Sequence, residues 1–189
     1  MDIILASGSP RRKELLKLIV NDFKVIPADV EEKADLSLPM GKMAEALAKL
    51  KADAVFCEHR DTLVIGSDTI VFLDGTPLGK PKDEEDAFRT LKKLQGRSHY
   101  VATGAAIVKE GYCDTFSTVT EVTFYPMTDE EIKAYIRTGE PMDKAGSYGI
   151  NGHGALFIEK INGDFYSVVG LPVAEVKKHL EICGFTCLI

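Results

Sequence analysis

The stretch "LVIGSDTIVFL", Leu63–Leu73, consists of two short apolar segments separated by Ser67-Asp68-Thr69. Its β-branched and aromatic residues predict a strand-like run, with a break at the polar centre. A carboxylate in such a run costs free energy unless it is paired, bound to a metal or hydrated. Asp68 therefore either accepts backbone hydrogen bonds at a bulge, or acts as a ligand for Mg²⁺ or as a base for water.

Outward from this run, the sequence alternates between helix and strand patterns. Residues 41–58 carry apolar side chains at helical spacing, with Lys51 at the border of the stripe that they form. The stripe consists of Met43, Leu47, Leu50 and Ala54. After the run, Asp74-Gly75 is typical of a hairpin turn, and Lys80-Pro81 closes the hairpin. The elements expected further along are a helix capped by Asp83 and ended by Gly96, strands over 99–108 and 115–125, a helix opened by the capping box at 128–131, a glycine-rich loop over 139–154, a hairpin of 155–160 with 165–169, and a helix from Pro172.

The chain begins with a short apolar run, residues 2–6, which stops at a Ser-Gly-Ser turn and is followed by leucines at helical spacing. Ser9 suits the N-cap and Pro10 the first helical position, so Arg11 and Arg12 should lie in the first turn. Cations there oppose the helix dipole, whereas the backbone N–H groups and two guanidinium groups suit a phosphate. The pair is therefore either a phosphate-binding element or two solvated surface arginines.

Length and composition fit an ordinary globular protein: 189 residues, of which 45% are hydrophobic. No fixed-period repeat, linker or low-complexity tract divides the chain. We therefore predict a single α/β domain over residues 1–189, with a mixed, largely antiparallel sheet flanked by helices. A helix-rich lobe at one end is the alternative.

Charge and hydropathy disfavour several classes of protein. A net charge of -6 is unlike the basic face that nucleic-acid binding needs. No apolar run approaches the roughly 18 residues of a membrane span, and the first residues lack the pattern of a signal peptide. Cys183 and Cys187 are weak evidence for a metal without an accompanying pair of histidines or a CxxC motif, so buried or free thiols are expected. We expect a cytoplasmic protein that binds neither nucleic acid nor membrane.

Four further residues are candidates for ligand binding. Glu32 lies in a short charge run, which is either a solvated loop or the source of a second carboxylate for a metal. Lys51 and Lys80 are suited to act as point charges on phosphate. The glycine-rich loop lets its backbone approach a ligand, and Asn151 within it carries an amide that can read the edge of a base. Cations, carboxylates and such a loop are what cleavage of a nucleotide polyphosphate requires.

Five motifs together resemble the Maf family of nucleoside triphosphate pyrophosphatases over nearly the whole chain: "LASGSPRRKELL", "VIGSDTIV", "LGKP", "GEPMDKAGSYGI" and "YSVVGLP". The resemblance implies a fold shared with inosine triphosphatases, with an elongated mixed sheet and two lobes around a nucleotide cleft. It also implies a divalent cation, Mg²⁺ or Mn²⁺, and commonly a homodimer. The form "DKAGSYGI" resembles the branch of the family that acts on dTTP and UTP.

The same resemblance assigns roles to individual residues. The family's phosphate-binding opening falls on Ser7, Arg11 and Arg12, its acid–base and metal region on Glu32 and Asp68, and its active-site lysines on Lys51 and Lys80. Asp68 is implied to accept a proton, and Arg11, Thr69 and residue 151 to influence base choice. The pyrimidine branch usually has glutamine where this chain has Asn151. The shorter side chain predicts a longer or water-mediated hydrogen bond to a base.

The reaction expected from these residues is hydrolysis of dTTP or UTP to the monophosphate and pyrophosphate. The alternative is a nucleotide-binding regulator of cell division and septum formation in which hydrolysis is weak or incidental. Asp68 favours the enzyme, because binding alone does not require a carboxylate that interrupts a strand.

Overall fold

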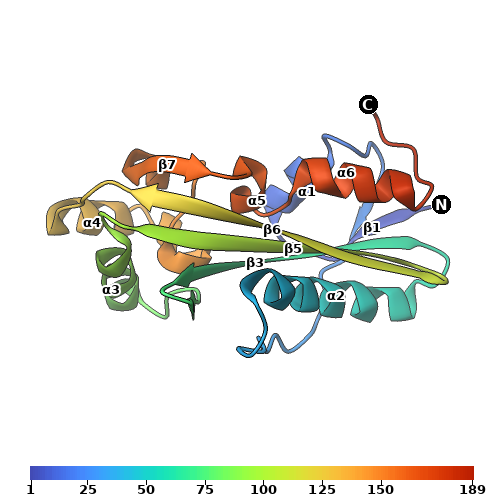
Figure 1. Cartoon of the computed structure of the whole chain (residues 1–189), viewed down its shortest axis with the longest axis horizontal. Helices are drawn as coiled ribbons and strands as arrows, with labels where there is room; N and C mark the ends of the chain where they lie inside the picture. The colour runs from blue at the N-terminus through green and yellow to red at the C-terminus, as the bar shows by residue number, and fades with distance from the viewer. The chain divides into compact units, whose positions relative to one another are not determined.

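The computed structural model describes Met1 to Ile189, and the chain forms two compact units. Unit 1 comprises Met1–Thr69, Thr103–Thr118 and Gly170–Ile189, and unit 2 comprises Ile70–Ala102 and Val119–Val169. One seven-stranded sheet has the strand order β2-β1-β3-β5-β6-β7, with β4 paired to β3. Helices lie against this sheet (Figure 1), so the predicted α/β class is confirmed.

The sheet is mixed, as predicted. Parallel pairs join β1 (Ile3–Leu5) to β2 (Lys24–Val25) and to β3 (Leu63–Leu73). Antiparallel pairs join β4 (Thr76–Leu78) to β3, and β7 (Ile158–Asn162) to β6 (Tyr112–Phe124). Only a two-residue turn separates β5 (Ser98–Lys109) from its neighbour β6, and so short a connection requires an antiparallel pair.

β3 runs without interruption from Leu63 to Leu73, so the predicted break at its polar centre is wrong. The glycine just before that centre is needed for packing. A Cβ on Gly66 would lie 2.2 Å from the carbonyl oxygen of Ala48, in α2 (Met40–Glu58). Gly66 therefore lets the helix backbone approach the strand at the level of Asp68, while the strand itself continues.

The second strand of the predicted hairpin at 155–169 is also wrong, because this segment is a helix. α5 (Phe165–Val169) follows Asp164, whose carboxylate accepts hydrogen bonds from the N–H groups of Tyr166 at 3.0 Å and Ser167 at 3.2 Å. An acidic side chain at this position satisfies N–H groups that a helix start leaves open. Local capping thus outweighs the apolar pattern, and β7 pairs with β6 instead.

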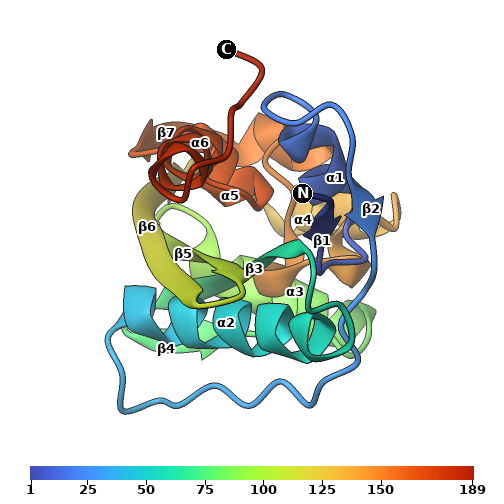
Figure 2. The ribbon, with the colours of Figure 1, turned by 90° about the vertical axis from the view of Figure 1, so that its right-hand side faces the viewer.

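In unit 1, helices cover both faces of the sheet (Figures 1 and 2). α2 lies on one face, and α1 (Pro10–Leu16) and α6 (Val173–Ile182) lie on the other. The buried side of α2 differs from the predicted stripe, since Leu50 is 39% exposed and alanines take much of the contact. Small residues at this contact allow the close approach of helix and sheet that Gly66 requires.

A valine at Gly104 is expected to destabilise the protein by about 1–3 kcal/mol through overpacking. A Cβ there would lie 2.3 Å from the carbonyl carbon of Ala44, which is helix backbone and cannot turn aside. Urea unfolding of Gly104→Val measures the effect. Gly79→Val is the matched control, because a Cβ on Gly79 meets nothing within 4 Å. Equal unfolding midpoints for the two variants would contradict the packing argument.

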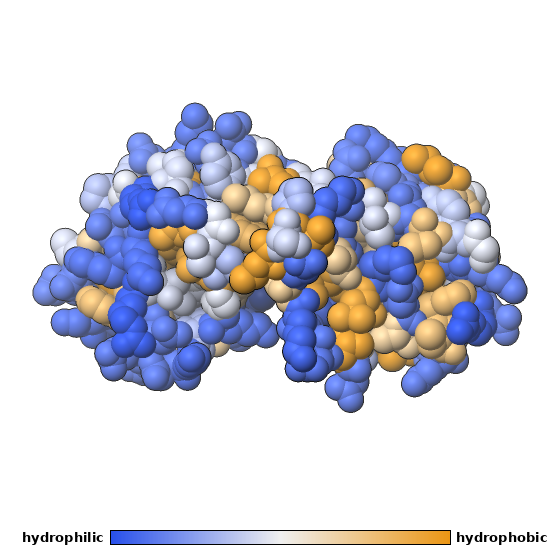
Figure 3. All heavy atoms as spheres, turned by 60° about the horizontal axis from the view of Figure 1, so that its bottom comes forward, coloured by the Kyte–Doolittle hydropathy of each residue, from blue (hydrophilic) through white to orange (hydrophobic).

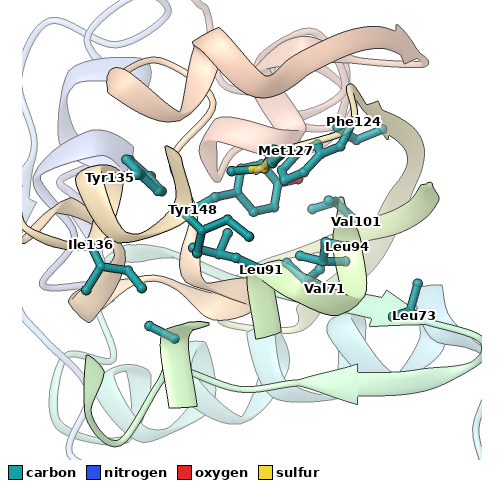
Figure 4. Close-up of a cluster of buried hydrophobic side chains, with 13 residues drawn as sticks. Val71, Leu73, Leu91, Leu94, Val101, Phe124, Met127, Tyr135, Ile136 and Tyr148 are labelled. Carbon is teal, nitrogen blue, oxygen red and sulfur yellow. The ribbon is translucent and has the colours of Figure 1, made fainter. Parts of the chain in front are cut away.

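Unit 2 has its own core, which α3 (Glu84–Leu94) and α4 (Asp129–Ile136) cover (Figure 4). Asp83 caps α3, and the Thr128 capping box opens α4, as the sequence predicts. The glycine-rich segment forms short 3-10 turns, namely η1 (Glu140–Asp143), η2 (Ala145–Ser147) and η3 (His153–Phe157). The large side chains of the core include Leu91, Leu94, Phe124, Met127, Ile132, Tyr135 and Tyr148.

His99 is buried in this core, with 1% of its surface exposed, and its Nε2 lies 2.8 Å from the hydroxyl of Tyr148. Burial lowers the pKa of His99 to about 4, from an ordinary value of 6.5. Because the folded-state pKa is the lower one, the neutral ring stabilises the fold fully above pH 6.5. This contribution is lost as the pH falls through about 4.

The free energy of unfolding is therefore expected to fall by up to about 3 kcal/mol between pH 7 and pH 4 on account of His99. Urea unfolding at a series of pH values measures this dependence. His99→Gln keeps a polar partner for Tyr148 without a titrating ring, and it should show a flatter profile. Parallel profiles for the two proteins would show that His99 does not carry the effect.

Hydrophilic residues predominate on the face shown in Figure 3, with hydrophobic residues scattered between them. None of the helices combines the length and apolar composition that crossing a membrane would demand.

Candidate functional site

The Arg12 side chain is the centre of a hydrogen-bond network in unit 1. Its Nε donates to the carbonyl oxygen of Gly170 at 2.8 Å, and its Nη2 donates to Thr69 Oγ1 at 3.0 Å. Nη1 donates to Ser7 Oγ at 3.3 Å. One guanidinium thus joins the turn after β1, the middle of β3 and the segment before α6.

Local sequence at the start of α1 places this side chain. Ser9 has an extended backbone and its hydroxyl accepts from the N–H of Arg12, and Pro10 follows it as predicted. Ser7 Oγ accepts from the N–H of Ser9 at 3.2 Å, which holds the turn closed. Arg11 and Arg12 therefore lie in the first turn of the helix, confirming that part of the sequence prediction.

Most of the hydrogen-bonding capacity of Arg12 is already used within the protein. Three of the five N–H groups of Arg12 are taken up by protein oxygens, which leaves one on each terminal nitrogen. Burial lowers the pKa of Arg12, and the negative charge of Asp68 acts in the opposite direction. Arg12 thus holds the local backbone and has limited capacity left for a ligand. Both Arg11 and Arg12 are half-buried.

A second cluster in the same unit joins Lys51 of α2 to two carboxylates. Lys51 Nζ lies 2.6 Å from Asp68 Oδ1 and 3.0 Å from Glu32 Oε1. The side chains of Lys51 and Asp68 are 11% and 9% exposed, while that of Glu32 is half exposed. Asp68 lies within a continuous strand, and its carboxylate is paired with the ammonium group of Lys51 in α2. This pairing offsets the free-energy cost of burying the carboxylate.

These carboxylates suit a hard divalent cation. Mg²⁺ is commonly held by one or two carboxylates together with substrate phosphates and water. One oxygen of Asp68 and one of Glu32 both contact Lys51 Nζ, so the two carboxylates already lie around a single positive charge. No group of three or more metal-binding side chains forms in the structure. The remaining ligands of such a cation would therefore have to come from substrate and water.

Two predicted residues lie in unit 2. Lys80 is exposed after β4, and the carbonyl oxygen of Gly79 before it accepts a hydrogen bond from the N–H of Gly146 at 3.1 Å. Asn151 is exposed in the turn before η3. The structure thus groups Ser7, Arg11, Arg12, Glu32, Lys51, Asp68 and Thr69 in unit 1, and Lys80 and Asn151 in unit 2.

Three residues of the Arg12 network were not predicted from the sequence: Ser67, Thr103 and Gly170. The hydroxyl of buried Ser67 donates to the carbonyl oxygens of Gly104 at 2.9 Å and Gly170 at 3.1 Å. Thr103 Oγ1 donates to Thr69 Oγ1 at 3.0 Å. In the sequence, only the glycine of "YSVVGLP", Gly170, pointed to this network. In the structure Gly170 has a φ of +137°, and its carbonyl oxygen accepts the hydrogen bond from Arg12.

Comparison with known proteins shows what the whole chain is similar to. The family model described as Maf-like protein matches residues 2–183. A dTTP/UTP pyrophosphatase of Bacillus velezensis is 51% identical over 95% of each chain. One of Thermococcus onnurineus is 52% identical over 97% of this chain and 98% of its own. A solved nucleoside-triphosphatase / dITP/XTP pyrophosphatase from Mycobacterium abscessus covers 97% of this chain and 99% of its own at a TM-score of 0.41 and 12% identity.

Proposed function

Because the chain belongs to the Maf-like protein family, we propose that it is a nucleoside triphosphate pyrophosphatase that hydrolyses dTTP and UTP to the monophosphate and pyrophosphate. The main structural support for this reaction is the position of Lys51 between two carboxylates. Its Nζ lies 2.6 Å from Asp68 Oδ1 and 3.0 Å from Glu32 Oε1. This arrangement supplies positive charge for phosphate and carboxylates for a proton or a cation in one place.

In this proposal four cationic groups hold the triphosphate: Arg11, the remaining N–H groups of Arg12, Lys51 and Lys80. Fixed cations aimed at oxygens that gain negative charge in the transition state lower the barrier to phosphoanhydride cleavage. Ser7 contributes by fixing the Arg12 guanidinium, to which its hydroxyl is bonded.

The Asp68 carboxylate is the proton acceptor for the attacking water. As the water oxygen bonds to the α phosphorus, its proton passes to a carboxylate oxygen of Asp68. The bond from the α phosphorus to the bridging oxygen breaks, and pyrophosphate leaves. Lys51, at 2.6 Å, keeps the carboxylate oriented while leaving its second oxygen available.

Glu32 and Asp68 are also the residues that would hold Mg²⁺ or Mn²⁺. Such an ion, when bound, neutralises phosphate charge and lowers the pKa of water. Glu32 is half exposed and reaches the cluster from a loop, so its carboxylate can adjust to an arriving ion more readily than that of buried Asp68.

For base selection we assign Thr69, Arg11 and Asn151. The Asn151 amide offers one donor and one acceptor direction, which match the N3–H and O4 groups of uracil and thymine. It is one methylene shorter than glutamine, so a bridging water is expected in the contact.

We further infer a homodimer in the cytoplasm, on the strength of the family resemblance. Light scattering coupled to size exclusion should then give twice the 20.7 kDa mass of the chain. A mass of one chain across micromolar concentrations would exclude the dimer.

The direct test of the function is product identification. The purified chain is incubated with dTTP, UTP, CTP, ATP and GTP in Mg²⁺ or Mn²⁺, and products are separated by anion exchange. Monophosphate and pyrophosphate in equal amounts are expected, fastest from dTTP and UTP. Release of orthophosphate without pyrophosphate would exclude the reaction. Tight nucleotide binding without turnover in either metal would favour a regulatory role instead.

A further inference from the structure

The carboxylate of Glu140 lies within a set of hydrogen-bond donors in unit 2. Oε1 accepts from the Tyr135 hydroxyl at 2.8 Å and from the N–H of Gly154 at 3.1 Å. Oε2 accepts from the N–H of His153 at 2.7 Å and lies 3.1 Å from His153 Nδ1. The Glu140 side chain is 14% exposed, so its bonds to Tyr135 and Gly154 are partly shielded from water, whereas His153 is exposed. A single carboxylate thus holds the backbone after Asn151.

The Tyr135 hydroxyl extends the same network to the other side of Asn151. It accepts a hydrogen bond from the N–H of Gly149 at 3.0 Å while donating to Glu140. The ring of Tyr135 belongs to the hydrophobic core of unit 2 (Figure 4) and makes an edge contact with Phe157. Anchored amides therefore lie two residues before and two residues after exposed Asn151.

Glycines allow this backbone to lie directly against its anchor. A Cβ on Gly152 would lie 2.4 Å from Glu140 Oε2, and a Cβ on Gly154 would lie 2.4 Å from the carbonyl oxygen of Gly149. The main chain of Glu140 is itself fixed, because Lys144 Nζ donates to its carbonyl oxygen at 2.7 Å. The loop is therefore shaped around the carboxylate.

The hydrogen-bond donors around Glu140 favour its ionised form. Burial alone raises the pKa of this carboxyl, but the bonds donated by His153, Gly154 and Tyr135 outweigh it and lower the pKa overall. A carboxylate only accepts hydrogen bonds, and each of these partners donates one. A carboxamide of the same size would turn an NH₂ group toward a donor, leaving both unsatisfied.

We propose that Glu140, through Tyr135, is a positioning residue for base selection: it fixes the backbone on both sides of Asn151 and so sets where the Asn151 amide meets the base. The inference rests on the proposed function, in which Asn151 contacts the base. Uracil and cytosine differ at two neighbouring groups, since uracil presents N3–H and O4 where cytosine presents N3 and N4–H₂. An amide held in one place and orientation can tell them apart, directly or through a water that it orients. Glu140 itself need not touch the substrate.

The test is Glu140→Gln, with kcat and KM measured for UTP and CTP. We expect the KM for UTP to rise about tenfold with kcat changed less than about threefold, because ground-state positioning is lost rather than chemistry. The preference for UTP over CTP, as a ratio of kcat/KM, should fall by about the same factor. An unchanged ratio in folded Glu140→Gln would overturn the proposal.

Two further variants separate positioning from general destabilisation. Glu131→Gln makes the same change in the capping box of α4, where Glu131 accepts from the N–H and hydroxyl of Thr128. It should lower stability and leave the UTP/CTP ratio unchanged. Tyr135→Phe keeps the ring in the core and removes only the hydroxyl, and it should lower the ratio even if Glu140→Gln fails to fold. A wild-type ratio in Tyr135→Phe would then overturn the proposal.

Failure of the proposed function is recognised separately, as absence of pyrophosphate release by the wild-type chain. Dissociation constants for UTP and CTP, from titration calorimetry, then give the ratio without turnover. A ratio that falls in Glu140→Gln supports the positioning role on binding alone, and an unchanged one overturns it.

Discussion

Asp68→Asn is expected to lower kcat for UTP by about 10²–10⁴-fold, the range for loss of a general base. The amide is close in size to the carboxylate, and its oxygen can still accept the hydrogen bond from Lys51 at 2.6 Å. It cannot take a proton from water, and it is a poorer ligand for a divalent cation. Steady-state pyrophosphate release measures the loss, and thermal unfolding establishes that the variant is folded.

Asp53→Asn is the matched control for this variant. Asp53 also pairs with a lysine, Lys49 on α2, but both side chains are more than 40% exposed. Exposed pairs of this kind contribute little, so both kcat and stability should stay near wild type. Turnover near the wild-type rate in folded Asp68→Asn would remove Asp68 from the chemistry.

Sequence patterns predict the local features of this fold well, because their causes lie within a few residues. The start of α1 follows from Ser9 and Pro10, and the start of α4 follows from the reciprocal bonds of Thr128 and Glu131. Each needs only the geometry of one helical turn. At α5 the apolar pattern favoured a strand and the capping carboxylate of Asp164 favoured a helix, and the segment is helical.

The contacts that form the candidate site could not be predicted from the spacing of residues along the sequence. Arg12 bonds to residues 57 and 158 positions away, and Lys51 meets Asp68 only because α2 packs closely on β3. That approach depends on Gly66, where any side chain would meet the backbone of α2. Motif resemblance named these residues as a set, but the hydrogen bonds that join Arg12 to Gly170, Thr69 and Ser7 follow only from the fold.

Arg12→Lys is expected to lower both stability and activity, although it keeps the positive charge. A lysine ammonium cannot reproduce the fork that bonds at once to Gly170, Thr69 and Ser7. Hydrogen bonds from a charged donor contribute about 1.5–3 kcal/mol each, and a lysine ammonium at this position loses more than one of the three. We therefore expect the free energy of unfolding to fall by about 2–4 kcal/mol and kcat/KM for UTP to fall by about 10²-fold.

A control of the same chemistry lies on the surface of unit 2, where Arg97 Nη2 contacts both carboxylate oxygens of Asp74 at 2.7 and 2.9 Å. Both of those side chains are largely exposed, so Arg97→Lys should change stability by less than about 1 kcal/mol and leave kcat/KM unchanged. If Arg12→Lys behaved like Arg97→Lys, charge alone would suffice at position 12. The fork geometry that joins the helix start to β3 would then have no part in holding the site.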